Sequence, residues 1–264
     1  MEFTKLIYKV EDGIAVVTMN YMKNLNAIDE VMAEELIEAV AEIERDPEVK
    51  VAVLRGPGKA FSAGGDIGFF YDLIQQGGEI KMGPLIERVG VVADGIKKSS
   101  KMYITSVAGA AAGAGFSLAI AGDFVICADN AKFILAFVNL GLVPDTGAAY
   151  LLCKTIGTAR AMELAATGRV MGAAEAKELG LVYQVTTPEE LDEVTMKLAR
   201  KLAAGPLVSY KCIKKQIYDA AYSDYKKWLV ETEAPTQAEC ANTEDFKEGV
   251  KAFKEKRKPQ FSGK

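Results

Sequence analysis

Short apolar segments of strand length alternate with helix-like segments in the first half of the chain. Residues 51–54, 102–107 and 123–128 are largely apolar, and helix-like stretches at 84–98 and 116–121 lie between them. Apolar strands that alternate with helices are typical of βαβ units around a parallel sheet that is buried on both faces. The pattern therefore predicts an α/β fold.

The N-terminal region is typical of a β-hairpin followed by a helix. Residues 3–10 and 14–20 are rich in strand-forming residues and flank Glu11-Asp12-Gly13, whose Asp-Gly pair favours a tight turn. Between Asp29 and Glu44, apolar residues recur at helical spacing. A hairpin and one amphipathic helix are therefore expected before the first buried strand.

The chain becomes mostly helical after Asp145. Residues 201–256 contain three helix candidates that are separated by two proline-containing breaks. No internal repeat, low-complexity tail or linker divides this region from the rest of the sequence. The sequence therefore predicts an α/β core at residues 1–200 and a helical region at residues 201–264.

None of the 264 residues is a histidine. This excludes Ser-His-Asp and Cys-His catalysis, histidine general bases and histidine-containing metal sites. The four cysteines lie far apart, and we interpret them as buried thiols in a reducing cytoplasm rather than as a disulfide frame or a zinc site: Cys127, Cys153, Cys212 and Cys240. Acid–base chemistry must then come from Asp, Glu, Lys, Tyr or Cys, or from backbone dipoles, and no metal is expected.

The charge of the chain also limits its partners. Its 32 basic residues are outnumbered by 36 acidic ones, giving a formal net charge of -4, which argues against a nucleic-acid or anionic-membrane partner. No apolar run reaches the roughly 20 residues that a membrane-spanning helix needs. The N-terminus alternates apolar and charged residues, unlike a signal peptide. We therefore expect a cytoplasmic protein.

Two glycine-rich clusters follow strands and precede helices. The first, Ala60–Ile67, contains Gly64-Gly65, and on its own it favours a tight turn in which Asp66 caps the next helix. The second, Gly109–Gly115, fits neither a dinucleotide fingerprint nor a phosphate-binding P-loop, and on its own it is compatible with close helix–sheet packing. Together, two such clusters could direct two backbone N–H groups at one oxygen, which is an oxyanion hole.

A third segment, Asn139–Gly147, places Asp145 at the start of a predicted helix. One interpretation is an N-cap, whose carboxylate accepts a hydrogen bond from the first helical turn. The other is a functional carboxylate in a dry pocket. Capping would lower the pKa of Asp145, whereas a dry pocket would raise it.

Several motifs, taken in order, resemble one family. Residues 61–67, with the sequence FSAGGDI, resemble the FSAGxD(L/I) motif of the enoyl-CoA hydratase/isomerase (crotonase) superfamily. Residues 107–119 resemble its (V)NGxAxGxGxxLA motif, with Ala108 where Asn is usual. Residues 141–147 resemble its GLxPxxG segment, and 167–181 and 255–261 are similar to its TGRxxxAxEAxxxGLV and EKRxPxF segments.

The resemblance implies a fold, a ligand and an assembly. The fold would be a crotonase-like spiral of ββα units with a C-terminal helical trimerisation region, in a homotrimer or a homohexamer that is a dimer of trimers. The ligand would be an acyl-CoA thioester, which is itself the substrate, so that no further cofactor is needed. By position, the backbone N–H groups of Gly65 and Ala114 would form the oxyanion hole. Ala114 stands where the family commonly has Gly.

The resemblance also implies binding residues. Those expected around CoA are Lys23, Ala27, Ala63, Asp66 and Ile67, with Phe253 and Lys256 bordering the CoA site of a neighbouring subunit. An alternative to CoA binding stays open for each of three residues. Lys23 and Lys256 could be solvated surface lysines, and Phe253 could be a packed side chain. The acyl pocket is expected to contain Phe61, Phe137 and Leu140, and these side chains, with Val143, could form a dry wall beside Asp145.

Departures from the family pattern favour one reaction. Hydratases of the family carry two catalytic glutamates, and those places hold Ser117 and Phe137 here. The remaining carboxylate is Asp145, at the place where related isomerases carry an acidic residue. Its Pro-Asp-Thr-Gly context most resembles the phenylacetate-pathway 1,2-epoxyphenylacetyl-CoA isomerase branch, which also acts as a Δ3,Δ2-enoyl-CoA isomerase.

The sequence therefore predicts an acyl-CoA double-bond isomerase of fatty acid metabolism or phenylacetate catabolism, with Asp145 as its catalytic base. Such a base would move a proton through an enolate held in the oxyanion hole. Two alternatives remain open. One is an enoyl-CoA hydratase or a ring-modifying acyl-CoA enzyme. The other is a non-catalytic subunit that binds CoA thioesters, although such a subunit has no need of a carboxylate at Asp145.

Overall fold

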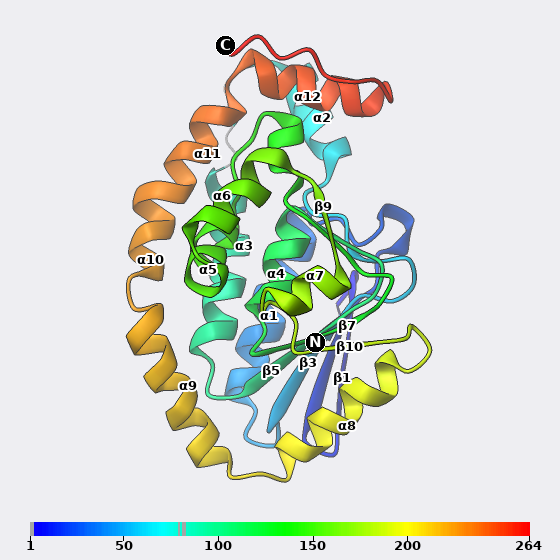
Figure 1. Ribbon diagram of the computed structural model, residues 1–264, viewed down its shortest axis with the longest axis vertical. Coiled ribbons are helices and arrows are strands. Elements are labelled where there is room, and N and C mark those ends of the chain that lie inside the picture. The colour runs from blue at the N-terminus through cyan, green and yellow to red at the C-terminus, as the bar shows by residue number, and fades with distance from the viewer. Residues whose placement is uncertain (1–2, 79, 81–82) are drawn as a thin grey trace.

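The computed structural model of the protein describes residues 3–78, 80 and 83–264 (Figure 1). Its strands form two sheets. The larger sheet has the order β1-β2-β3-β5-β7-β10, formed by Leu6–Glu11, Ile14–Met19, Val51–Arg55, Met102–Val107, Phe124–Ala128 and Gln184–Thr186. The smaller sheet has the order β4-β6-β8-β9, formed by Ala60–Ser62, Ala110–Ala112, Lys132–Ile134 and Val170–Gly172.

The predicted hairpin is confirmed. β1 and β2 pair antiparallel from Leu6 opposite Met19 to Glu11 opposite Ile14. The two turn residues, Asp12 and Gly13, have φ values of 51° and 76°. Two consecutive positive φ values are what a two-residue hairpin turn of type I′ requires, and Asp-Gly is one of the sequences that adopts it readily.

The predicted parallel sheet is also confirmed. β2, β3, β5, β7 and β10 run parallel. Successive pairs of strands, β3 with β4, β5 with β6 and β7 with β8, each supply one strand to each sheet and are followed by helical structure. This repeated ββα order is the spiral expected of a crotonase-like fold. β6 lies inside the second glycine cluster, where its small residues pair with β8 in continuous register and with β4 across a register shift.

The larger sheet is covered on both faces. Ala52 and Leu54 of β3 belong to the main core cluster, together with residues of α1 (Glu30–Arg45) and α3 (Gly83–Lys98). Val51 and Val53 point the opposite way and belong to a second cluster with α8 (Leu191–Ala203). Side chains alternate between the faces of a strand, so an uninterrupted apolar strand fits this double burial.

The remaining helices surround the smaller sheet and extend along one side of the molecule (Figure 1). They are α2 (Ile67–Gln76), α4 (Ala114–Ala121), α5 (Ala148–Ile156), α6 (Thr158–Thr167), α7 (Ala173–Glu178), α9 (Leu207–Ala221), α10 (Tyr225–Trp228), α11 (Ala234–Ala241) and α12 (Glu244–Lys254). Two 3-10 turns, Met22–Asn24 and Ala136–Leu140, and one π turn, Leu229–Glu233, complete the described helical structure.

The C-terminal helices pack against the body of the same chain. α11 contacts α3, and α12 contacts α2 and the 3-10 turn Ala136–Leu140. Tyr225, Phe246 and Val250 are buried in the main core cluster with residues of the α/β region. Helices are therefore confirmed within residues 201–264, and they fold back onto the core. No helix in the described ranges has the length and apolarity needed to cross a membrane.

Gly115 lies where α4 packs closely on β4, and a substitution there tests how tight this packing is. An added Cβ at Gly115 would lie 2.6 Å from the carbonyl oxygen of Ser62, whereas one at Gly172 would meet nothing within 4 Å. In an open helix, Gly→Ala stabilises by about 1 kcal/mol. Because overpacking costs about 1–3 kcal/mol, we expect Gly115→Ala to lower the melting temperature and Gly172→Ala to leave it nearly unchanged. Thermal unfolding followed by circular dichroism would show this, and an equal or higher melting temperature for Gly115→Ala would contradict the packing.

Candidate active site

The two glycine clusters lie against each other. β4 and β6 pair in parallel, so the chain leaves both strands at the same edge of the smaller sheet. An added Cβ at Gly64, whose φ is +87°, would approach the carbonyl oxygen of Ala112 to 2.5 Å. Only glycine fits this combination of a left-handed backbone and direct backbone contact.

The N–H groups of Gly65 and Ala114 are both left free by this arrangement. Gly65 lies just before α2, and Ala114 is the first residue of α4, where an N–H has no partner within the helix. Within the described part of the chain, neither N–H donates to a protein acceptor. Both residues line one cavity of about 900 Å³. Two free N–H groups at one cavity wall can stabilise a developing negative charge on an oxygen.

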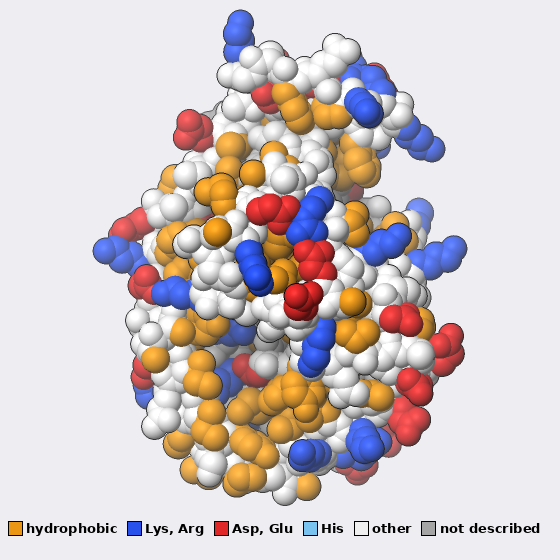
Figure 2. Space-filling view, viewed as in Figure 1, with side chains coloured by type: hydrophobic (Ala, Val, Ile, Leu, Met, Phe, Trp, Pro, Cys, Tyr) orange, Lys and Arg blue, Asp and Glu red, His pale blue; other side chains and the backbone are white. Residues whose placement is uncertain are grey.

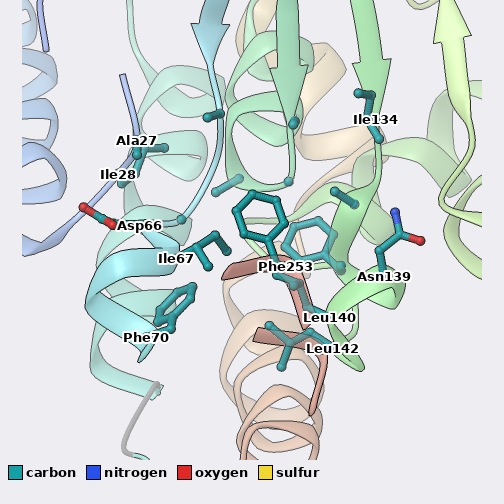
Figure 3. Close-up of a pocket in the computed structure, with 18 of the residues that line it drawn as sticks. Ala27, Ile28, Asp66, Ile67, Phe70, Ile134, Asn139, Leu140, Leu142 and Phe253 are labelled. Atoms are coloured by element: carbon teal, nitrogen blue, oxygen red, sulfur yellow. The ribbon is translucent and has the colours of Figure 1, made fainter. Parts of the chain in front are cut away.

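The cavity lies between α2 on one side and the β8 to Leu142 segment on the other, with Phe253 of α12 between them (Figure 3). Its wall is mainly apolar. The side chains labelled in Figure 3 are Ala27, Ile28, Asp66, Ile67, Phe70, Ile134, Asn139, Leu140, Leu142 and Phe253. A largely apolar cavity of this size fits a small-molecule ligand with a long apolar part.

Asp145 also lines this cavity and is 8% exposed. One carboxylate oxygen, Oδ1, accepts a hydrogen bond of 2.9 Å from Oγ1 of Thr146. The other, Oδ2, accepts a hydrogen bond of 3.0 Å from Nε2 of Gln237 in α11. Burial raises the pKa of Asp145 to about 6, and the two hydrogen bonds oppose that rise. At neutral pH the group is therefore an ionised base that accepts a proton readily.

Asp145 does not cap a helix, so the capping interpretation is wrong. α5 begins at Ala148, its N-cap position is Gly147, and no side chain caps it. The backbone carbonyl of Asp145 accepts the hydrogen bond from Ala148 instead. The chain makes one more tight turn before the helix, with Thr146 at φ 57° and Gly147 at φ 80°, and this turn directs the carboxyl group into the cavity wall.

A second carboxyl group, Glu233, is buried near Asp145. Both of its oxygens accept a hydrogen bond from the backbone N–H of Gly147, at 3.1 and 2.9 Å. Burial, followed by the negative charge of Asp145, raises the pKa of Glu233 to about 9. Of the two groups, Glu233 therefore holds its proton at neutral pH, and Asp145 carries the negative charge.

Most residues expected at the site line the cavity. They are Gly65, Ala114 and Asp145, together with Ala27, Ala63, Asp66, Ile67, Phe137, Leu140 and Phe253. Asp66 does cap α2, because its carboxylate accepts from the N–H of Gly68 and Phe69, and it also accepts from the side chain of Asn24. Phe253 borders the cavity of its own chain and is 61% exposed.

Four expected residues do not line the cavity, and one of them is Val143, which was expected in the dry wall beside Asp145. Phe61 is buried in the main core, since its side chain points from β4 away from the cavity wall. Lys23 lies in the 3-10 turn Met22–Asn24, whose last residue lines the cavity in its place. Lys256 lies beyond the end of α12 at φ 54°, and the cavity is bordered there by other basic residues.

Those basic residues, Lys254 and Arg257, were missed by the sequence reasoning, as were Gln237, Glu233 and Thr146. Lys254 and Arg257 are close in sequence to Lys256, and only the end of α12 decides which of them faces the cavity. Gln237 and Glu233 reach the Asp145 turn from about 90 positions away in the chain. No local sequence signal links such residues.

The two positions that differ from the family's hydratases hold no acid at the cavity. Oγ of Ser117, which is fully buried in α4, donates a hydrogen bond of 2.9 Å to the backbone carbonyl of Asp145. Phe137 contributes an apolar ring to the wall. In the described ranges no cluster of three potential metal ligands occurs, and a reaction without metal or separate cofactor stays a prediction.

Comparison with known proteins agrees with this arrangement. The sequence profile described as enoyl-CoA hydratase/isomerase matches residues 9–264. The chain belongs to the enoyl-CoA hydratase/isomerase family. It is 36% identical over its whole length to the full trans-2-decenoyl-[acyl-carrier-protein] isomerase of Streptococcus mutans, and 37% identical, again over both full lengths, to the 1,2-epoxyphenylacetyl-CoA isomerase of Escherichia coli.

A solved structure of the family has the same fold. The crystal structure of an enoyl-CoA hydratase from Mycobacterium avium subsp. paratuberculosis superposes with a TM-score of 0.89 at 31% identity, covering 99% of this chain and all of the other. The crotonase-like fold is thereby established. Isomerase and hydratase names both occur among these relatives, so the choice between the two reactions depends on the site.

The raised pKa of Asp145 predicts a stability effect that does not depend on substrate. In the unfolded chain Asp145 ionises near its ordinary pKa of 3.8, whereas in the folded protein it ionises near 6. Folding is therefore penalised as the pH rises through this window, and the penalty is complete above pH 6. A shift of two units corresponds to about 3 kcal/mol at most.

Asp145→Asn removes this penalty, so we expect the variant to be more stable than the wild type at pH 7 and equally stable only well below pH 3.8. The asparagine oxygen can still accept from Gln237, and its amide can donate to Oγ1 of Thr146. Urea unfolding at a series of pH values measures the difference. A difference that is constant with pH would contradict the raised pKa.

Proposed function

We propose that this protein is an acyl-thioester double-bond isomerase that converts 3-enoyl thioesters to 2-enoyl thioesters, with Asp145 as its proton-carrying base. The observation that supports it best is one ionisable, buried carboxylate on the same cavity wall as two free backbone N–H groups. Asp66, the other carboxylate on that wall, is already engaged by helix N–H groups and Asn24.

The reaction needs one base and one anion site. The Asp145 carboxylate takes a proton from C2 of the substrate, and the C–H electron pair becomes a dienolate spread over the thioester oxygen, C2 and C4. The N–H groups of Gly65 and Ala114 stabilise the oxygen, and each such donor is worth about 3–4 kcal/mol. The Asp145 carboxylic acid then returns the proton to C4. The carbonyl reforms with a double bond between C2 and C3, and no electrons are gained or lost.

The proposal also covers the carrier of the acyl group and the metabolic context of the reaction. We propose CoA as the carrier, with Lys254 and Arg257 as the basic side chains nearest its phosphates, since both border the cavity. The two isomerase relatives act on an acyl-carrier-protein substrate and on a CoA substrate according to their names. Fatty acid metabolism and phenylacetate catabolism are both compatible with this chemistry, as is a cytoplasmic location.

Hydration is the second candidate reaction, and the hydratase relative favours it. It needs an activated water and a separate proton donor. Ser117 is occupied in holding the Asp145 turn, and Phe137 has no proton to give.

Ring modification of an acyl-CoA by Asp145 alone remains compatible with the site. A non-catalytic binding subunit is disfavoured, because burying a carboxylate at a cavity costs stability without benefit to binding.

Replacing the base tests the proposed reaction. We expect Asp145→Asn to lower kcat for isomerisation of 3-hexenoyl-CoA by about 10²–10⁴-fold, the usual contribution of a general base. Affinity for a saturated acyl-CoA should change little, because the loss concerns the transition state. The product is followed by its conjugated ultraviolet absorbance. Asp72→Asn, which removes an exposed carboxylate outside the cavity, is the control. Wild-type turnover in Asp145→Asn would refute this role.

We also propose a homotrimer, or a dimer of trimers, assembled through the C-terminal helices. Exposed apolar side chains on α9 support an interface there, including Val208 at 78% and Ile217 at 56% exposure. Figure 2 shows apolar side chains gathered on the lower part of the molecule, where α8 and α9 lie. Surfaces of this kind commonly mark protein contacts.

Light scattering should give three or six times the chain mass of 28.4 kDa at micromolar concentration. Ile217→Asp should reduce the assembly to smaller species, because a charge would be buried at the interface. Val10→Asp, at an exposed position in β1, serves as the matched control. A monomeric wild type would rule the assembly out.

A further inference from the structure

The turn that carries Asp145 is held by two side chains of one C-terminal helical segment. Glu233 ends the π turn Leu229–Glu233, and Gln237 follows four residues later in α11. Residues four apart lie on the same helical face. Pro235 removes one helical hydrogen bond here, and a π turn in front of it is a local irregularity that is common at functional sites. Both side chains are buried, at 1% and 0% exposure.

Gln237 has one possible orientation. The backbone N–H of Val143 donates to its Oε1 at 3.0 Å, so this atom must be the amide oxygen. The amide nitrogen, Nε2, is then the atom 3.0 Å from Oδ2 of Asp145, and it donates. Gln237 therefore bridges the start of the turn and its carboxylate. It does not line the cavity and cannot touch a substrate there.

The rest of the turn is fixed at three further points. Glu233 accepts from the N–H of Gly147, Ser117 donates to the carbonyl of Asp145, and Thr146 donates to Oδ1 of Asp145. Thr146 adopts a φ of 57°, a conformation that is costly for a residue other than glycine. A strained turn of this kind persists only when its surroundings hold it.

We propose that Gln237 is a positioning residue of the reaction, which aims the Asp145 carboxylate into the cavity, and that Glu233 holds the turn on which Asp145 lies. The inference rests on the proposed function, because it assigns these two residues to the same proton transfer. One carboxylate must reach C2 and then C4 of a bound substrate. Fixing its plane by a donor on each oxygen keeps the remaining lone pairs directed at the substrate.

The charged surroundings of Asp145 define the expected pH effect. The titratable groups coupled to its charge are Glu233 of the π turn and Tyr225 of α10, and the charge of Asp145 raises the pKa of each. Ser117 of α4 and Thr146 are neutral contacts. The hydrogen bond from Gln237 lowers the pKa of Asp145. Without it, Asp145 stays protonated to higher pH, and the acidic limb of the rate profile moves upward.

Gln237→Met tests the inference, because methionine fills a similar volume without a donor. We expect kcat for 3-hexenoyl-CoA to fall by about 10- to 100-fold, as misplacing a reacting group does. The acidic limb of the kcat profile should move to higher pH, while affinity for a saturated acyl-CoA stays unchanged. Thr236→Ala changes the exposed neighbour of Gln237 on the same helix and should behave as the wild type.

A second variant and a direct titration keep the test decisive if Gln237→Met fails to fold. Gln237→Glu keeps the side-chain shape and the acceptor for Val143, but it places a second acid beside Asp145, which should also raise the pKa of Asp145. Carbon-13 NMR of the Asp145 carboxyl should show this rise in either variant. An unchanged pKa, or wild-type kcat and pH profile in Gln237→Met, would overturn the inference while leaving the proposed function intact. Absence of isomerisation by the wild type and Thr236→Ala would instead refute the proposed function, and the inference with it.

Discussion

Backbone contact between the two glycine-rich turns is the constraint on which the rest of the site depends. Gly64 lies against the carbonyl of Ala112, and Gly115 lies against Ser62, at distances that leave no room for a Cβ atom. This contact brings the ends of two parallel strands together, so Gly65 and Ala114 both line one cavity. Because the proposed anion site uses backbone atoms, the side chain at position 114 would matter little there, and an alanine can stand where glycine is common in the family.

The Asp145 carboxyl group depends on a different part of the chain. Its raised pKa comes from burial, and the C-terminal helical segment places Gln237 against its carboxylate and Glu233 against the neighbouring Gly147. Burial alone would favour the neutral acid, whereas the donors Thr146 and Gln237 favour the ionised form. The balance leaves a base whose pKa lies close to neutral. A helical segment far along the chain thus adjusts the chemistry of a turn in the α/β core.

The sequence predicts those features that depend on local patterns. The Asp-Gly turn, the apolar parallel strands and the cap at Asp66 follow from residues within a few positions of each other. The short strands β4, β6, β8, β9 and β10 were missed, because three-residue strands of small or mixed residues carry no distinct periodicity. Phe61 was placed in the acyl pocket from the motif around it, but strand alternation directs its side chain into the core. Gln237 could not be found, since only tertiary packing brings it to Asp145.

The absence of histidine and the distribution of roles among the site residues both favour a reaction with a single proton-transferring side chain. In the proposed reaction, backbone N–H groups handle the negative charge and one carboxylate carries the proton, so no side chain has to act as a separate acid. Hydration would require a second proton-transferring group to activate water. The two positions that supply such groups in related hydratases carry here a hydroxyl that anchors the Asp145 turn and an aromatic ring that lines the cavity. A dry site also protects the dienolate from stray protonation by solvent, which would interrupt the return of the same proton to C4. Under the proposed isomerisation, Ser117 and Phe137 at these two positions supply an anchor for the Asp145 turn and an apolar wall, which suit a single base.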